Sequence, residues 1–529
     1  MKLRRMCGCA APYWLIVAAY VLSVGFYALY GAHNINADDA SEMILAAQLN
    51  DEGVFLSENW LYSTELRVIS PVPLYQLGLK LFSTWHGART FAVAVVLAGV
   101  IAAALFVMHQ LGLKRSAPWL AFILSLPFSG MYAYIVLYGC YYAVHLMLAF
   151  LMLGLVCRYG RTGMAHGKAS CVLLAAMGFV GGLGGVRMMT MIIAPLAAAS
   201  FALAVCELKN AERCAQAAHE PGVRMCAASG VTLAAAVAGF ALNMGVLRQR
   251  YSYHSYVDMR LGQFELEDFW HQFSGIVRDM GYRAYVPFFS MEGVSSWVTL
   301  GICALMLFAL IRMVIRWRDV RAELRLLILT AVLAVALGMA LNVLLNQILT
   351  RYFLVGTVLL MIVLFAWIET EPCRNGALRT WGIGLLAACF AFQAQCVLRY
   401  DYTLGQVNYE MAAQWLLERG YTQGYATFWN ANTLTEASDG QIEMWVLEDG
   451  RRGEWMNLSL HDILQSKDHI DRDPEGKVFL LVNETEANVD APLLDPDHLI
   501  GDMVAWSYDI YGYESVEEMR ELIAQGEKR

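Results

Sequence analysis

Residues 12–30 of this 529-residue chain read PYWLIVAAYVLSVGFYALY, a stretch without a single charge. A helix of this length rises far enough to cross the hydrocarbon core of a bilayer. Lys2, Arg4 and Arg5 precede the stretch, so a cleaved signal peptide has to be considered. The stretch is longer than an ordinary signal core, and no small-residue cleavage site occurs before Gly31-Ala32. It therefore predicts a retained first membrane span.

Apolar blocks of roughly 18–23 residues recur after this one as far as Arg399. They predict about eleven spans, at 12–32, 89–111, 117–135, 137–157, 169–185, 188–206, 227–247, 296–315, 325–345, 352–369 and 380–398. The composition agrees, because 58% of the residues are hydrophobic and only 16% are charged. The weakest span is 117–135, where Pro127, Ser129 and Gly130 mark either a tight turn or a broken helix. The fold class predicted is a polytopic α-helical membrane protein.

Lys and Arg collect at the N-terminus and in every second loop, at 114–115, 158–168, 209–224, 312–325 and 374–379. Because basic loops stay on the cytoplasmic side, this pattern predicts a plasma-membrane protein with a cytoplasmic N-terminus and an extracytoplasmic C-terminus. We expect a transmembrane domain over 1–400 and a soluble α/β domain over 401–529, with strands at 425–429, 442–447 and 477–482. Two outer loops are long, 33–88 and 248–296. The acidic C-terminal part, in a chain of net charge −8, argues against a nucleic-acid partner.

The first outer loop opens with an acidic pair in the sequence Asn36-Ala-Asp38-Asp39-Ala-Ser-Glu42. Carboxylates at the membrane boundary are costly unless they are solvated or used. Here Asp38 or Asp39 can accept a proton from a hydroxyl group or bind a cation, and the adjacent pair is compatible with Mg²⁺ or Mn²⁺. Aspartate also caps helices often, and the pair alone favours a capping role.

The same loop continues with the aromatic and charged segment NWLYSTELRV, residues 59–68. Trp60 and Tyr62 are candidates to stack on a sugar face, and Glu65 and Arg67 add charge near the membrane. The alternative is a pair of interfacial aromatic anchors with a simple ion pair. The segment alone does not separate the two interpretations.

A long first outer loop with an acidic pair directly after the first span, surface helices, many spans and an outer C-terminal domain resembles the GT-C glycosyltransferases. This superfamily includes protein O-mannosyltransferases and the bacterial transferases that attach aminoarabinose to lipid A. Asp38-Asp39 matches the position of its acidic motif, although protein O-mannosyltransferases have Asp-Glu there. Residues 59–68 and the stretch GYATFWN at 424–430 resemble segments of uncharacterised bacterial relatives.

The resemblance implies a cell-envelope enzyme that transfers a sugar, with inversion, from a polyprenyl-phosphate carrier to a hydroxyl group on a glycan, lipid or protein. Asp38 or Asp39 would be the base, and cationic side chains would bind the phosphate. Candidates for substrate binding are Trp60, Tyr62, Glu65, Arg67, Arg187, Arg283, Arg351 and Tyr352. Arg187 follows the glycine-rich run 181–185, which lets a lipid or a backbone approach closely. An arginine at a span boundary is also a common snorkelling anchor.

Three other functions have to be weighed. A lipid-linked sugar flippase or transporter is disfavoured because the spans show no inverted repeat and few charges. A polysaccharide polymerase also uses lipid-linked sugar outside the membrane, and only the placement of the acidic pair separates it from the GT-C reaction. The chain can also be a membrane scaffold that displays its C-terminal domain.

Overall fold

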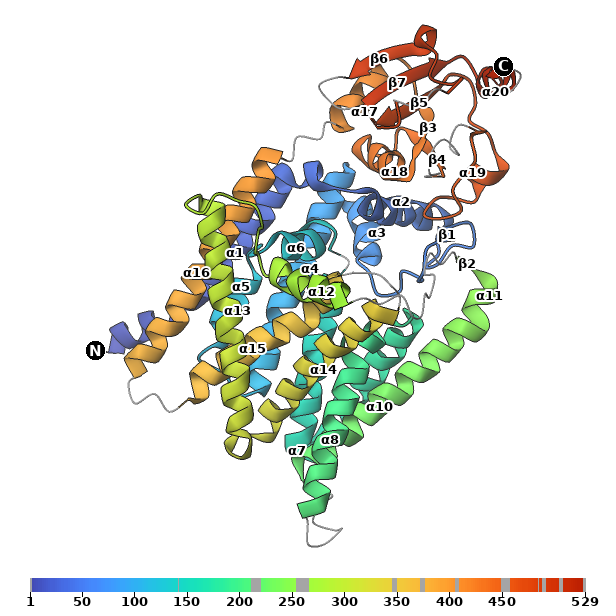
Figure 1. Cartoon of the computed structure of the whole chain (residues 1–529). Coiled ribbons are helices and arrows are strands. Elements are labelled where there is room, and N and C mark those ends of the chain that lie inside the picture. The colour runs from blue at the N-terminus through green and yellow to red at the C-terminus, as the bar shows by residue number, and fades with distance from the viewer. Residues whose placement is uncertain are drawn as a thin grey trace.

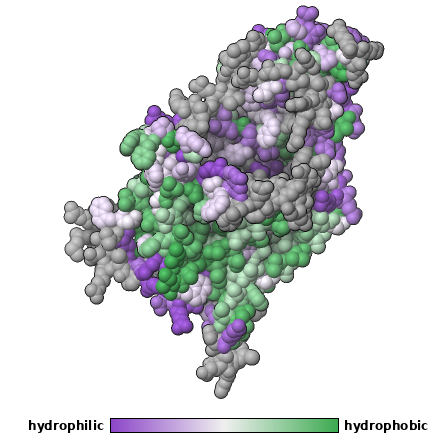
Figure 2. Space-filling view, viewed as in Figure 1, coloured by the Kyte–Doolittle hydropathy of each residue, from purple (hydrophilic) through white to green (hydrophobic). Residues whose placement is uncertain are grey.

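The structure is a computed structural model that describes residues 2–140, 142–210, 220–253, 266–344, 350–371, 376–404, 409–448, 457–483, 485–487, 491–503 and 508–526. Long helices occupy most of the molecule, and the strands of a small C-terminal domain lie at one end of them (Figure 1). Hydrophobic side chains cover the helical part, whereas the opposite end, around the small domain, is largely hydrophilic (Figure 2).

Nine helices within the described ranges are long and apolar enough to cross a membrane. They are α1 (Lys2–Tyr30), α4 (Trp85–Gln110), α7 (Ala143–Leu183), α8 (Ala194–Asn210), α10 (Pro221–Leu242), α13 (Met291–Ile315), α14 (Ala322–Leu344), α15 (Leu354–Thr370) and α16 (Gly376–Leu404). The chain is therefore a multi-pass membrane protein, and the predicted fold class is confirmed.

Three of the predicted spans take a different form. The stretch 117–135 contains only α5 (Ala117–Leu124), a turn through Pro127, α6 (Gly130–Tyr132) and a π-helical segment (Ala133–Tyr138), so the broken helix is correct. The spans at 137–157 and 169–185 form the single long helix α7, which is interrupted at Gly163 by a positive φ of 62°. Its second part, Gly167–Leu183, is shorter than the other spans.

The two outer loops meet each other. The first contains α2 (Ala37–Glu52), β1 (Leu61–Tyr62) and α3 (Val72–Leu81), and the second contains α11 (Arg248–Arg250), β2 (Ser252–Tyr253) and α12 (Leu266–Asp279). Leu61 is paired with Ser252 in a short parallel ladder of β1 and β2. The loops thus form one layer on the helical bundle.

The C-terminal domain is built on a five-stranded sheet in the order β4-β3-β5-β7-β6. Its strands are β3 (Gln423–Thr427), β4 (Glu443–Leu447), β5 (Val478–Asn483), β6 (Leu499–Met503) and β7 (Tyr508–Tyr513). β3 is parallel to β4 and β5, whereas β7 is antiparallel to β5 and β6. The helices are α17 (Tyr409–Glu418), α18 (Phe428–Ala437), α19 (Asp468–Asp471) and α20 (Val516–Gly526). The three predicted strands correspond to β3, β4 and β5.

Helix α18 of the C-terminal domain packs directly on α2 of the first outer loop. Ala37, at the start of α2, belongs to the same buried cluster as Ala431 and Leu434 of α18. The small domain therefore covers the helix that carries the acidic pair.

Candidate functional site

The acidic pair lies in the first turn of α2, and neither aspartate caps the helix. The Asn36 side chain accepts a hydrogen bond from the Asp39 backbone N–H at 3.1 Å and so takes the capping position. Its amide nitrogen donates to the Tyr134 hydroxyl at 2.9 Å, which fixes the cap against the bundle. Helix α2 ends at Gly53, whose φ of 68° suits a glycine after a helix. The alternative that the aspartates act only as caps is therefore not supported.

Two carboxylates of α2 are shielded from water. Asp39 and Glu42 are 0% and 1% exposed, and their carboxylate oxygens accept no hydrogen bond from any described residue. Burial raises the pKa of Asp39 well above its usual value, and the Arg89 charge only partly offsets this. Burial likewise raises the pKa of Glu42, against the opposing charge of Arg67. Asp38 is only partly buried, and it precedes Glu42 by one helical turn on the same face.

The charged residues of the segment 59–68 pair with partners outside it. Arg67 Nη1 lies 3.3 Å from Glu42 Oε1, and Glu65 Oε2 lies 3.4 Å from Arg187 Nε. Gly185 allows the second contact, because its φ is 98° and an added Cβ would come within 3.1 Å of Glu65 Cγ. Both pairs are largely buried, so the first outer loop brings two carboxylate–guanidinium pairs to the acidic turn.

Arg187 and Tyr352 both contact the ring of Tyr142. The Arg187 guanidinium lies 5.1 Å from the centroid of the Tyr142 ring, and the Tyr352 ring packs edge-on against Tyr142 at 6.3 Å. Arg351 directly precedes Tyr352 in the short helical segment Thr350–Phe353, so both arginines lie in the neighbourhood of Tyr142. Arg351 lines a small cavity with Asp279, and burial raises the pKa of Asp279 to about 7.

Arg283 lies in a separate cavity of about 120 Å³, together with Arg278 and Gln393. Its backbone N–H donates to the Ser296 hydroxyl at 3.0 Å. Phe128 lines both cavities. Only Arg351 is next to a residue, Tyr352, that contacts Tyr142. Of the three arginines predicted at the phosphate, Arg187 and Arg351 are thus brought together, and Arg283 is not.

Trp60 and Tyr62 lie inside the protein. Both side chains are 0% exposed and belong to the hydrophobic core of the first outer loop. The Tyr62 hydroxyl accepts a hydrogen bond from the Ser57 backbone N–H at 3.1 Å. Neither ring has an exposed face for a sugar, so the structure gives these residues a packing role.

A buried ion pair that the sequence did not indicate holds the site together. Arg89 of α4 binds Glu436 of α18 through two parallel hydrogen bonds, of 2.6 Å from Nε and 2.7 Å from Nη2. The same guanidinium donates to the Asp39 backbone carbonyl at 2.8 Å and to the Tyr75 hydroxyl at 3.1 Å. One side chain therefore joins a membrane helix, the acidic turn, α3 and the C-terminal domain. A charge in the first turn of an otherwise apolar span was the available signal.

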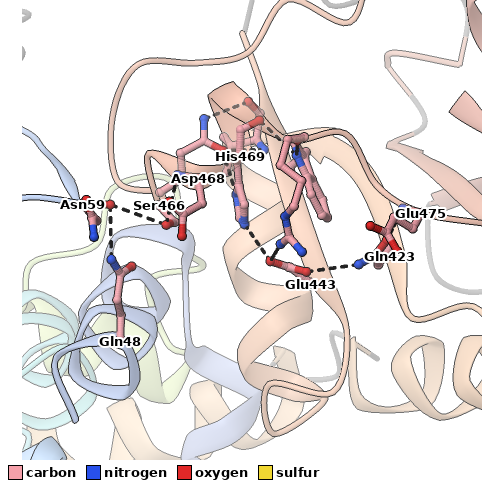
Figure 3. A network of polar contacts seen from close by, with 12 residues as sticks. Gln48, Asn59, Gln423, Glu443, Ser466, Asp468, His469 and Glu475 are labelled. Atoms are coloured by element: carbon pink, nitrogen blue, oxygen red, sulfur yellow. Dashed lines mark hydrogen bonds and ion pairs between the residues drawn. The ribbon is translucent and has the colours of Figure 1, made fainter. Parts of the chain in front are cut away.

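A second connection joins Asn59 to the C-terminal domain (Figure 3). The Asn59 carbonyl accepts hydrogen bonds from the Gln48 side chain at 3.2 Å and from the Ser466 hydroxyl at 3.4 Å. Beyond Ser466 the network continues to Glu443 of β4, which lies 3.1 Å from His469 Nε2 and accepts from Gln423 at 3.2 Å. These contacts link the segment that begins at Asn59 to the sheet of the C-terminal domain.

By sequence, the acidic pair is compatible with a divalent cation but does not require one. Among the residues that the structure describes, no group of three or more His, Cys, Asp or Glu side chains is arranged to hold a metal ion. Asp38, Asp39 and Glu42 do not form such a group, so we assign no step to a metal.

No family model matches the sequence, and no curated protein matches it significantly. The structure, in contrast, is similar to ArnT from Cupriavidus metallidurans over 95% of this chain and 98% of that one, with a TM-score of 0.59 and 11% identity in the apo state. With ArnT bound to undecaprenyl phosphate the TM-score is 0.57 at 12% identity, with the same coverage. The chain has the GT-C fold.

A second GT-C structure agrees. The Archaeoglobus fulgidus oligosaccharyltransferase in complex with Zn and sulfate matches over 89% of this chain and 68% of that one, with a TM-score of 0.51 at 12% identity. The GT-C resemblance predicted from the acidic pair and the long first outer loop is thus confirmed at the level of the fold. The structural match to ArnT includes nearly the full length of both chains.

Proposed function

We propose that this protein is an inverting glycosyltransferase that moves a sugar from a polyprenyl-phosphate carrier to an acceptor hydroxyl on the outer face of the membrane. The observation that carries the proposal is the acidic first turn of α2, with its partly open Asp38 beside two buried carboxylate–guanidinium pairs. The GT-C fold supports it, since ArnT has been crystallised with undecaprenyl phosphate.

In the proposed reaction the acceptor oxygen attacks the anomeric carbon while its proton passes to Asp38. Asp38 is the better base because it is partly accessible, whereas Asp39 is completely buried and its raised pKa favours the protonated form. The bond between the anomeric carbon and the phosphate oxygen breaks, and its electron pair stays on the phosphate. Attack opposite to the leaving group inverts the anomeric centre.

The leaving phosphate gains negative charge, which a guanidinium group stabilises best. Arg187 lies over the Tyr142 ring and Arg351 is next to Tyr352, which packs against the same ring, so these two arginines are the proposed phosphate ligands. Glu65 would hold Arg187 in position through its 3.4 Å contact. Arg67 would keep Glu42 ionised and so maintain the negative potential around Asp38.

The test uses the purified full-length chain in liposomes with a panel of undecaprenyl-phosphate sugars, with and without a chelator. Release of undecaprenyl phosphate is measured in the presence of cell-envelope acceptors. We expect Asp38→Asn to lower the rate by about 10²–10⁴-fold, the contribution of a general base. Asp51→Asn is the matched control, because Asp51 lies at the exposed far end of the same helix.

Wild-type turnover by Asp38→Asn would show that this carboxylate is not the base. Movement of lipid-linked sugar across the bilayer without release of the carrier phosphate would instead favour a flippase. A lower rate of undecaprenyl-phosphate release in the presence of the chelator would show that a divalent cation takes part in the reaction.

A further inference from the structure

Helices α13, α15 and α16 line an apolar groove of about 480 Å³ that the proposed transfer reaction does not use. Its walls are formed by aliphatic side chains such as Leu305, Leu364 and Leu385. Leu305 and Leu385 are 45% and 68% exposed, so the groove is open to the lipid phase. A groove of this composition takes an apolar chain.

One end of the groove is basic. Glu371 lies there, directly after α15, with Arg312 Nη2 at 2.7 Å from one carboxylate oxygen and Arg316 Nη1 at 3.1 Å from the other. Arg379 donates to the Glu371 backbone carbonyl at 2.9 Å. Arg316 also lies 3.7 Å from Asp319, so both carboxylates are paired with Arg312 or Arg316, whereas Arg379 is in no ion pair with any described residue. The positive charge of Arg379 favours an anion.

Two hydrogen-bond donors at this end have no acceptor among the described residues. The Arg379 Nε–H and the Trp367 indole N–H are shielded from water and donate to no acceptor among the described residues. Both residues line the groove. A buried N–H without an acceptor is costly, so this end of the groove suits a ligand with acceptor oxygens.

We propose that the groove binds an anionic glycerophospholipid, with its phosphodiester at Arg379 and Trp367 and one acyl chain between α13, α15 and α16. Basic pockets between membrane helices bind anionic headgroups in this way, and the aliphatic walls match an acyl chain. A zwitterionic lipid offers the same oxygens and chain but carries no net charge to complement the arginines. The site does not depend on the proposed glycosyltransferase function.

The chain offers matched variants for a test. Gly382 lines the groove, and a Cβ added there meets nothing within 4 Å, so Gly382→Leu fills the groove without disturbing the packing. Gly384 lies on the same helix, also has open space and is not part of the groove wall, so Gly384→Leu is the control. For the charge, Arg379→Gln is compared with Arg318→Gln, because Arg318 is exposed and outside the groove wall.

The delipidated full-length protein is titrated with phosphatidylglycerol or phosphatidylcholine, and the bound lipid is measured by native mass spectrometry. We expect phosphatidylglycerol to bind about fivefold more tightly, Arg379→Gln to abolish this preference and Gly382→Leu to lower the occupancy of both lipids. The two control variants should match the wild type. Equal affinity for both lipids, wild-type binding by Arg379→Gln, or preferential binding of undecaprenyl phosphate in the groove would overturn the proposal.

Discussion

At the scale of single residues, the buried carboxyl group of Asp39 makes stability depend on pH. Burial raises its pKa, so the folded protein binds a proton more tightly than the unfolded chain does. The stability associated with this proton is fully present below the unfolded pKa of about 3.9 and is lost as the pH rises through the folded value. Asparagine does not titrate, so we expect the Asp39→Asn variant not to lose this stability as the pH rises. The melting temperature of the variant minus that of the wild type should therefore increase from pH 5 to pH 8. A pH-independent difference would contradict the assignment.

Arg187 offers a second test at this scale. Arg187→Gln should lower kcat/KM for the lipid-linked donor by about 10–100-fold, because the charge at the proposed phosphate site is lost. Arg187→Lys should give an intermediate value, since lysine keeps the charge but not the planar group that lies over Tyr142. Arg250→Gln is the control, because the Arg250–Glu58 pair is exposed. Equal losses in the lysine and glutamine variants would show that the charge of Arg187 contributes nothing.

The sequence identified most of the charged residues of this cluster but not their partners. Glu65 and Arg67 are two positions apart, and the simple interpretation paired them with each other. Their observed partners are Arg187 and Glu42, which the folding of the loop brings to them. Pairing between distant residues depends on tertiary structure, so sequence spacing could not predict it.

At the scale of elements, the Arg89–Glu436 pair fixes α2 between α4 and α18. Arg89→Met should destabilise the protein by about 3–5 kcal/mol, because it leaves the Glu436 carboxylate buried without a partner. The double variant Arg89→Met/Glu436→Leu should lose less than either single variant, since neither charge of this pair remains buried without its partner. Thermal unfolding in detergent measures all three. Additive losses in the double variant would exclude coupling between the two side chains.

The contact between α7 and α10 depends on glycine. A Cβ at Gly182 would lie 1.9 Å from the Ala236 carbonyl oxygen, so Gly182→Ala has to push the two helices apart. Gly230 of α10 has nothing within 4 Å, and Gly230→Ala should be neutral or slightly stabilising. We expect a loss on the order of 1–3 kcal/mol for Gly182→Ala in a thermal unfolding measurement. Equal stability of the two variants would be inconsistent with this close packing.

The long helices were predictable because 18 or more apolar residues in sequence have few alternatives to a membrane span. The region 117–135 is equally apolar, but Pro127 interrupts its helix. β6 and β7 were not predicted, because segments such as YDIYGY in β7 lack a clear alternation of apolar and polar residues. Their position in the sheet comes from the pairing of β7 with β5 and of β6 with β7, contacts that do not appear in local sequence.

At the scale of the whole molecule, the distribution of basic residues predicts the orientation in the membrane. A cysteine at Glu475, in the C-terminal domain, should react with a membrane-impermeant maleimide in intact cells. A cysteine at Arg318 should react only after permeabilisation, because that loop is predicted to be cytoplasmic. Both positions are exposed. The reverse labelling pattern would invert the topology and would place the acidic pair on the cytoplasmic side.

The Arg89–Glu436 pair also sets the order of assembly during synthesis. The two residues are 347 positions apart, so at roughly 5–20 residues per second the ribosome adds Glu436 about 17–70 s after Arg89. During that interval α4 is already made, but the acidic turn lacks the helix that covers it. In a nascent chain that ends before α18, the carboxylates of α2 thus remain uncovered. The covered arrangement of the acidic turn therefore forms only once α18 has been synthesised.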